Sequence, residues 1–161
     1  ALSALEGEMI LSYGDILFRR YILDLLLETE GDIVVVVDAK KKGSGEIVAG
    51  QTADHAKCSI PFVDDILEDQ LIELEQISSG LAEATLDGVW IGLVKLSARG
   101  TSLMRDEITE MQAEKLHLKA SLPDVVNRLI AKGTKPRVIY ISGHWWDVND
   151  AVDLAKAHNF L

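Results

Sequence analysis

The chain has 161 residues, a net charge of −10, a hydrophobic content of 48% and a charged content of 26%. This length and composition predict one globular domain and argue against a disordered or fibrous chain. The negative charge argues against a nucleic-acid-binding protein that uses a broad basic face. The longest apolar run, Ile33–Val37, is far shorter than the roughly 20 residues of a membrane-spanning helix, so we expect no membrane partner.

Cys58 is the only cysteine, so a disulfide within the chain is excluded and a reducing, cytoplasmic location is expected. We expect its side chain to behave as a small, partly buried apolar group. The chain opens with Ala1 rather than Met and shows no secretory signal, and we expect an upstream segment to be missing.

The first quarter of the chain predicts a strand, a helix and a second strand. Glu8–Ser12 is short and apolar and is followed by Gly14, which is typical of a buried strand. Arg20–Glu28 carries apolar residues at offsets that form a helical stripe. Asp32–Val37 contains five consecutive β-branched residues, which suits a strand covered on both faces. This order predicts a βαβ unit and a parallel sheet.

The middle of the chain gives weaker patterns. Lys40–Gly45 is rich in lysine and glycine and predicts a loop, and Glu46–Ala49 and Ala56–Ile60 are short strand candidates. Pro61–Gly80 repeats apolar residues at three- and four-residue steps among many acids, so we expect an amphipathic helix there. Gly88–Lys95 predicts another buried strand.

The last third predicts two helices, a strand and a final helix. Ser102–Leu118 has a helical apolar pattern, and Ser121–Lys132 begins with a good N-cap residue and stops at Gly133. Arg137–Ile141 alternates like a strand, and Asp150–His158 predicts the final helix. We therefore expect residues 1–161 to form a single α/β domain with a mixed, mainly parallel, Rossmann-like sheet flanked by helices.

Polar residues follow two of these strands. Asp15 comes just after the first strand and Gly14, and Asp147 and Asn149 follow the last strand at alternating positions. Ligands bind beyond the carboxyl ends of strands in open α/β sheets, and these oxygen donors suit magnesium. The alternative is structural, because Asp15 is also typical of a turn and Asn149 or Asp150 of a helix cap.

Aromatic residues give a further, weaker signal. Trp90, Trp145 and Trp146 are candidates to flank a cationic amine through cation–π contact, and packing in the core or at a rim is the alternative. Gly92 interrupts a buried strand, which often marks the close approach of a ligand or of another backbone. The apolar face around Trp90 is also a candidate for pairing with a second copy of the chain.

Four segments, two of which overlap, resemble known nucleotidyltransferases. Tyr13–Phe18 resembles the "GD…F" metal motif of the enzymes that couple a nucleoside triphosphate to a sugar phosphate, phosphocholine or phosphonate. Trp146–Leu154 resembles their carboxy-terminal metal segment. Gly88–Leu93 and Ser121–Leu154 resemble one subgroup, the cytidylyltransferase-like domain fused to phosphoenolpyruvate phosphomutases of phosphonate biosynthesis.

The resemblance implies a role for specific residues. Asp15 matches the family's first metal-binding aspartate, Asn149 its second ligand and Asp147 the acid two positions earlier. Substrate contacts are implied for four further residues, Gly14, Trp90, Gly92 and Trp146.

The implied activity is magnesium-dependent transfer of a nucleoside monophosphate, CMP in the subgroup, to a phosphonate or a phosphorylated small molecule, with release of pyrophosphate. The alternatives are a sugar-phosphate nucleotidyltransferase and a catalytically silent interaction or regulatory domain of a phosphoenolpyruvate phosphomutase.

One departure from the family pattern is large. The family begins with a strand and a G-x-G-x-R loop followed by a lysine, which hold the triphosphate, and nothing similar precedes Tyr13. The glycine-rich stretch Lys40–Gly45 lacks a following helix and is expected to be an ordinary turn. The chain therefore resembles the later two-thirds of a nucleotidyltransferase domain, and we expect little or no activity from it alone.

Overall fold

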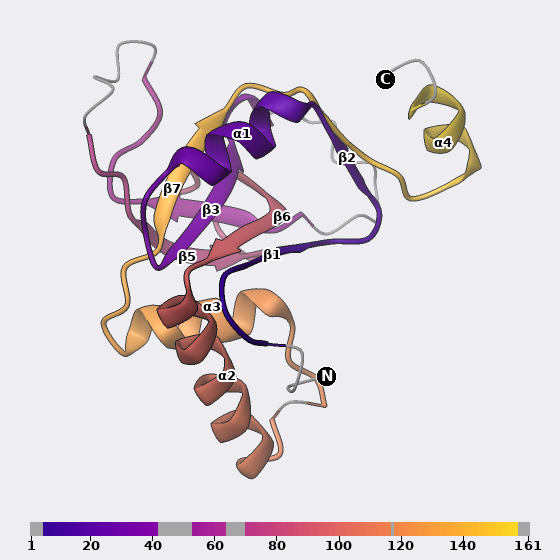
Figure 1. The fold of residues 1–161 in the computed structure, drawn as a ribbon. Helices are drawn as coiled ribbons and strands as arrows, with labels where there is room; N and C mark the ends of the chain where they lie inside the picture. The colour runs from indigo at the N-terminus through magenta and orange to yellow at the C-terminus, as the bar shows by residue number, and fades with distance from the viewer. Residues whose placement is uncertain (1–4, 42–52, 64–69, 117, 158–161) are drawn as a thin grey trace.

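The computed structural model describes residues 5–41, 53–63, 70–116 and 118–157 (Figure 1). In chain order its elements are β1 (Met9–Ser12), β2 (Ile16–Phe18), α1 (Arg20–Glu28), β3 (Ile33–Asp38), the short 3₁₀ helix η2 (Ala39–Lys41), β4 (His55–Cys58), β5 (Leu74–Ser78), β6 (Gly88–Leu96), α2 (Ala98–Ala113), α3 (Leu122–Ala131), β7 (Arg137–Ile141), β8 (Trp145–Asp147) and α4 (Ala151–Ala157). No helix in these ranges is long and apolar enough to cross a membrane.

A six-stranded mixed sheet forms the centre of the structure. Its strands follow the order β5-β4-β6-β3-β7, and β1 also pairs with β6. Strands β1, β3, β4 and β7 run in one direction, whereas β5 and β6 run in the other. The predicted α/β class with a mixed sheet is therefore confirmed.

The predicted βαβ unit is interrupted by β6. Leu96 of β6 lies opposite Met9 of β1 and also opposite Ile33 of β3, so β6 separates β1 from β3, the two strands of the predicted unit. Among the described strands the parallel ladder is β3 with β7, and β6 pairs antiparallel with each of its neighbours. A strand late in the chain can enter a sheet between earlier ones, and no local pattern announces this.

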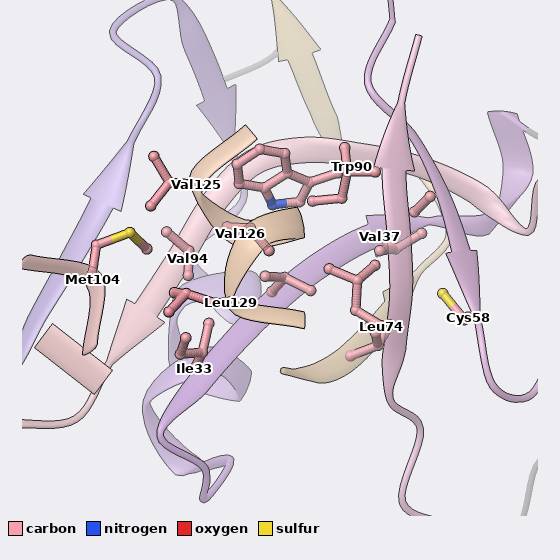
Figure 2. Close-up of a cluster of buried hydrophobic side chains, with 14 of the residues drawn as sticks. Ile33, Val37, Cys58, Leu74, Trp90, Val94, Met104, Val125, Val126 and Leu129 are labelled. Carbon is pink, nitrogen blue, oxygen red and sulfur yellow. The ribbon is translucent and has the colours of Figure 1, made fainter. Parts of the chain in front are cut away.

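Both faces of β3 are covered, as its uninterrupted apolar sequence predicts. The odd-numbered residues Ile33, Val35 and Val37 belong to the core cluster beneath α2 and α3 (Figure 2). The even-numbered Val34 and Val36 pack in a second cluster with residues of α1. Because side chains alternate across a strand, β3 contributes side chains to both cores.

Two helices match their sequence signals closely. α1 covers the predicted range, and its buried residues Ile22 and Leu26 are one helical turn apart. α3 carries the predicted cap at Ser121: the Ser121 hydroxyl accepts from the Asp124 N–H, and the Asp124 carboxylate accepts from the Ser121 N–H at 2.7 Å. Local sequence signals were sufficient for both.

The helix α2 begins earlier and ends earlier than predicted. Ser97 caps it, because the Ser97 hydroxyl accepts a hydrogen bond from the Gly100 N–H at 3.0 Å. Its Glu107 carboxylate is buried and pairs with Arg128 and Lys132 of α3. Although burial opposes ionisation, these two cations lower the pKa of Glu107 below its ordinary value.

The helix predicted over Pro61–Gly80 is wrong, because this range contains β5. β5 pairs antiparallel with β4, and the two residues before it contact β7: Glu73 forms an antiparallel bridge with Arg137, and the Val138 N–H donates to the Ile72 carbonyl at 2.8 Å. The apolar spacing suited a helix, but pairing with two strands overrides it.

Other differences concern short elements. β4 spans His55–Cys58, slightly before the predicted strand, whereas β2 and β8 were not predicted. The strand predicted at Glu46–Ala49 and the loop beyond Lys41 lie outside the described residues. The same holds for residues 64–69, 117 and 158, which belong to the helices predicted at Pro61–Gly80, Ser102–Leu118 and Asp150–His158.

Candidate functional site

The two sequence segments with the candidate metal ligands meet in space. Strands β2 and β8 form an antiparallel ribbon in which Ile16 lies opposite Asp147 and Phe18 opposite Trp145. One pair further on, the Val148 N–H donates to the Asp15 carbonyl at 2.8 Å. Residues 15–18 and 145–148, which are far apart in the sequence, therefore lie side by side; Figure 1 shows β2 of this ribbon on the same side of the molecule as α4.

The three candidate ligands differ in how the ribbon holds them. Asp147 lies within β8 and is half-buried, and its side chain shares a face of the ribbon with Ile16. Asp15 lies in the turn before β2 and Asn149 follows β8, so both are outside the paired residues, and both are exposed. Strand pairing therefore fixes the face of the ribbon on which the Asp147 side chain lies. The directions of the Asp15 and Asn149 side chains depend instead on the turns that carry them.

The donor set limits which metal sites are possible. In the described ranges, no group of three or more His, Cys, Asp and Glu side chains is arranged to hold a metal ion. A closed site made by the protein alone is therefore not found there. One or two carboxylates and an amide oxygen instead fit magnesium, which takes its remaining ligands from phosphates and water.

Capping of α4 falls to Asp150. The Asp150 carboxylate accepts from the backbone N–H groups of Val152 and Asp153, both at 2.8 Å. The backbone N–H of Asn149 donates to the Asp153 carboxylate at 3.3 Å. Of the two residues that the sequence offers as the cap of the last helix, Asp150 is therefore the one whose side chain accepts these hydrogen bonds.

Gly92 makes room for Tyr13, the residue that begins the turn at Asp15. Gly92 has a φ of +78°, and a Cβ added to it would lie 2.1 Å from the Tyr13 ring. The Tyr13 N–H donates to the Gly92 carbonyl at 3.0 Å. Of the two expectations for this glycine, the approach of another part of the protein accounts for it.

A Cβ added at Gly14 would meet nothing within 4 Å. The outer side of this turn is therefore open, in contrast to the crowded position at Gly92.

The tryptophans pack mainly in the core. Trp90 is 2% exposed, its Nε1–H donates to the Leu93 carbonyl at 3.1 Å, and it lies in the cluster with Val126 (Figure 2). The expectation that Trp90 lies on an apolar face for a second copy is therefore wrong, because the sheet and α3 enclose it. Trp145 is also buried, whereas Trp146 is half-buried.

Asp38 is a buried carboxylate whose role the sequence did not reveal. It ends β3 and is 1% exposed. Its Oδ1 accepts from the N–H groups of Lys40 and Gly143, both at 3.0 Å, and its Oδ2 accepts from the Trp145 Nε1–H at 2.7 Å. Asp38 thus joins the end of β3 to the start of β8. An acid directly after a fully apolar strand was the available signal.

Cys58 is 4% exposed, and burial raises the pKa of its thiol to about 12. A thiol that stays protonated at neutral pH is a poor nucleophile, so the expectation of an apolar, structural cysteine is confirmed.

Comparison with protein-family models and with curated protein sequences gives no match. Solved structures do match. The chain is 15% identical to the inositol-1-phosphate CTP transferase from T. maritima, with a TM-score of 0.65 over 96% of this chain and 55% of that one. For a putative glucose-1-phosphate thymidylyltransferase from Bacillus anthracis the identity is 14%, the TM-score 0.60 and the coverage 98% and 56%.

A third match is the CTP:phosphocholine cytidylyltransferase from Streptococcus pneumoniae, with 10% identity, a TM-score of 0.58 and coverage of 98% and 59%. The chain spans little more than half the length of each of these structures. At such low identity the likeness concerns the fold alone. The chain has the α/β fold of the nucleotidyltransferase structures that it matches.

Proposed function

We propose that the chain is part of a nucleotidyltransferase domain. This domain transfers a nucleoside monophosphate from a nucleoside triphosphate to a phosphorylated small molecule or a phosphonate, and it releases pyrophosphate. The observation that supports this most is the β2–β8 ribbon, which brings Asp15 beside the segment of Asn149. It does so in a fold that solved CTP and thymidylyl transferases share.

The proposed cation site uses Asp15 and Asn149, with Asp147 as a third oxygen donor nearby. Asp15 and Asn149 are exposed and lie at the end of the ribbon, where a phosphate can approach. A bound magnesium ion would neutralise the phosphate charges that a chain of net charge −10 otherwise repels. The protein residues would place that charge and orient the nucleotide.

The nucleotide and the acceptor are narrower parts of the proposal. CTP is favoured because two of the matched enzymes are named for CTP, and because the sequence resembles the cytidylyltransferase-like subgroup. The resemblance also favours a phosphonate acceptor and a parent protein with a phosphoenolpyruvate phosphomutase domain.

The second candidate is sugar-phosphate nucleotidyl transfer. The thymidylyltransferase match and a match to a UDP-glucose pyrophosphorylase, at 12% identity and a TM-score of 0.61, favour it. The same cation site would serve both reactions, and the acceptor would distinguish them.

A direct binding experiment tests the cation site. Calorimetry with CTP in the presence and absence of magnesium is run on the wild type and on Asp15→Ala, Asn149→Ala and Asp147→Ala. The exposed Asp106→Ala on α2 is the control, because α2 lies at the other end of the molecule (Figure 1). We expect magnesium-dependent binding that Asp15→Ala and Asn149→Ala abolish and Asp106→Ala preserves. Binding that survives Asp15→Ala would contradict the proposal.

An activity assay tests whether the residues of this chain suffice for catalysis. The chain is incubated with magnesium, a nucleoside triphosphate and aminoethylphosphonate, phosphocholine or a sugar phosphate, and pyrophosphate is measured. We expect little release, because no triphosphate-binding G-x-G-x-R loop occurs in this sequence. Rapid release would show that these residues suffice for catalysis, and the active acceptor would identify the reaction.

A further inference from the structure

We propose that Tyr13 is the positioning residue of Asp15 and that Asp54 holds Tyr13 in place. This inference rests on the proposed function, because it concerns the carboxylate assigned to the cation. The Tyr13 hydroxyl donates to the Asp54 Oδ2 at 2.8 Å. Asp54 immediately precedes β4, so this bond connects the turn that carries Asp15 to a different strand of the main sheet.

Tyr13 is fixed by three further contacts. Its N–H donates to the Gly92 carbonyl at 3.0 Å, and its ring lies over Gly92, whose missing Cβ leaves the space. The ring centroid is 5.6 Å from that of the buried Trp90, at an interplanar angle of 57°. The side chain is therefore held along its whole length, from the backbone amide to the hydroxyl.

The turn that follows Tyr13 depends on such anchors. Gly14 and Asp15 are exposed, and glycine gives the backbone much conformational freedom. The turn is fixed on one side by Tyr13 and on the other by the bond from the Val148 N–H to the Asp15 carbonyl. With both hydrogen bonds in place, the backbone of Asp15 is held in one position, and its carboxylate can be directed toward a cation.

The test compares two tyrosine hydroxyls. Tyr13→Phe removes the bond to Asp54, and Tyr140→Phe removes a bond of equal length, 2.8 Å, from the Tyr140 hydroxyl to the Ile60 carbonyl. Both tyrosines are half-buried, so the two variants carry similar general costs. Asp54→Asn keeps an acceptor oxygen for Tyr13, whereas Asp54→Ala removes it.

Two measurements are made on each variant. Amide hydrogen exchange at Gly14, Asp15 and Ile16 reports local order, and calorimetry with magnesium and CTP reports binding. In Tyr13→Phe and Asp54→Ala we expect exchange to speed up and the CTP affinity to fall, each by about three- to ten-fold, the value of one hydrogen bond. Tyr140→Phe is expected to leave both unchanged, and Asp54→Asn to restore them to within about two-fold.

Exchange at these amides that is equal in Tyr13→Phe and Tyr140→Phe would overturn the inference. Faster exchange with unchanged CTP affinity would also overturn it, because the order would then have no bearing on the ligand. If the wild type itself does not bind magnesium and CTP, the proposed function fails. The exchange comparison alone then decides whether Tyr13 orders the turn.

Discussion

The α2–α3 side of the molecule and the β2–β8 ribbon place their charges in opposite ways. On the first, the Glu107 side chain is 1% exposed and is neutralised by Arg128 and Lys132. On the second, Asp15 and Asn149 are exposed at the end of a small ribbon outside the main sheet. Buried, paired charges fix the packing of two helices, whereas exposed oxygens contribute little to stability and remain available to a ligand.

Asp38 connects the two regions, because it lies at the end of β3, which packs against α2 and α3, and accepts hydrogen bonds at the start of β8. We expect Asp38→Ala to lower the free energy of unfolding by about 3 kcal/mol, since the N–H groups of Lys40 and Gly143 and the buried Nε1–H of Trp145 lose their bonds to its carboxylate. Urea unfolding measures the effect, with the exposed Asp24→Ala as the matched control. Equal losses in the two variants would show that Asp38 does not join the regions.

The packing of the Tyr13 ring against Gly92 gives the next largest expected effect on stability. We expect Gly92→Ala to cost about 2–4 kcal/mol of stability, from the clash with the Tyr13 ring and the left-handed backbone together. Gly133→Ala is the control, because Gly133 has a φ of +92° but an added Cβ would meet nothing within 4 Å. The difference between the unfolding free energies of the two variants isolates the cost of the clash. Equal losses would show that the Tyr13 ring does not pack against Gly92.

Glu107 tests the buried charge. We expect Glu107→Gln to cost about 1–3 kcal/mol at neutral pH, because the ion pairs across α2 and α3 are lost. The folded-state pKa of Glu107 is below its ordinary value of 4.5, so its contribution is present above that pH and disappears as the pH falls through the folded-state pKa. Wild type and variant should therefore converge in acid, as followed by urea unfolding at several pH values. A difference that persists in acid would mean that packing rather than charge is lost.

The ribbon should show the smallest effects on stability. We expect Asp15→Ala and Asn149→Ala each to change the free energy of unfolding by less than about 0.5 kcal/mol, because both side chains are exposed. Thermal unfolding of the two variants beside the wild type provides the measurement. A loss above about 1 kcal/mol for either would identify it as a structural residue and weaken the contrast between the regions.

The sequence predicted the elements whose signals are local. Five consecutive β-branched residues predict β3, and Ser121 with Asp124 predicts the start of α3. It did not predict β2 and β8, because three-residue strands have no period of their own and exist through their pairing with each other. β5 was missed because the apolar spacing of its segment suited a helix, whereas its pairing with β4 makes it a strand.

For the candidate site, too, local signals were readable from the sequence and contacts between distant segments were not. Residue types and their positions after strands indicated Asp15, Asp147 and Asn149, whereas their neighbours depend on contacts across the chain. The bond from Tyr13 to Asp54, and the three bonds accepted by Asp38, join segments that no spacing rule links. Burial of Trp90 likewise comes from the sheet order and from α3.

Binding of a divalent cation and nucleotide at the end of the β2–β8 ribbon is the central claim. Manganese favours the same oxygen ligands as magnesium and broadens the NMR signals of nearby nuclei. With Mn²⁺ and CTP, we predict that broadening in the wild type centres on residues 13–15 and 147–149, disappears in Asp15→Ala and persists in Asp106→Ala. Broadening that centres elsewhere, or that remains in Asp15→Ala, would contradict the account.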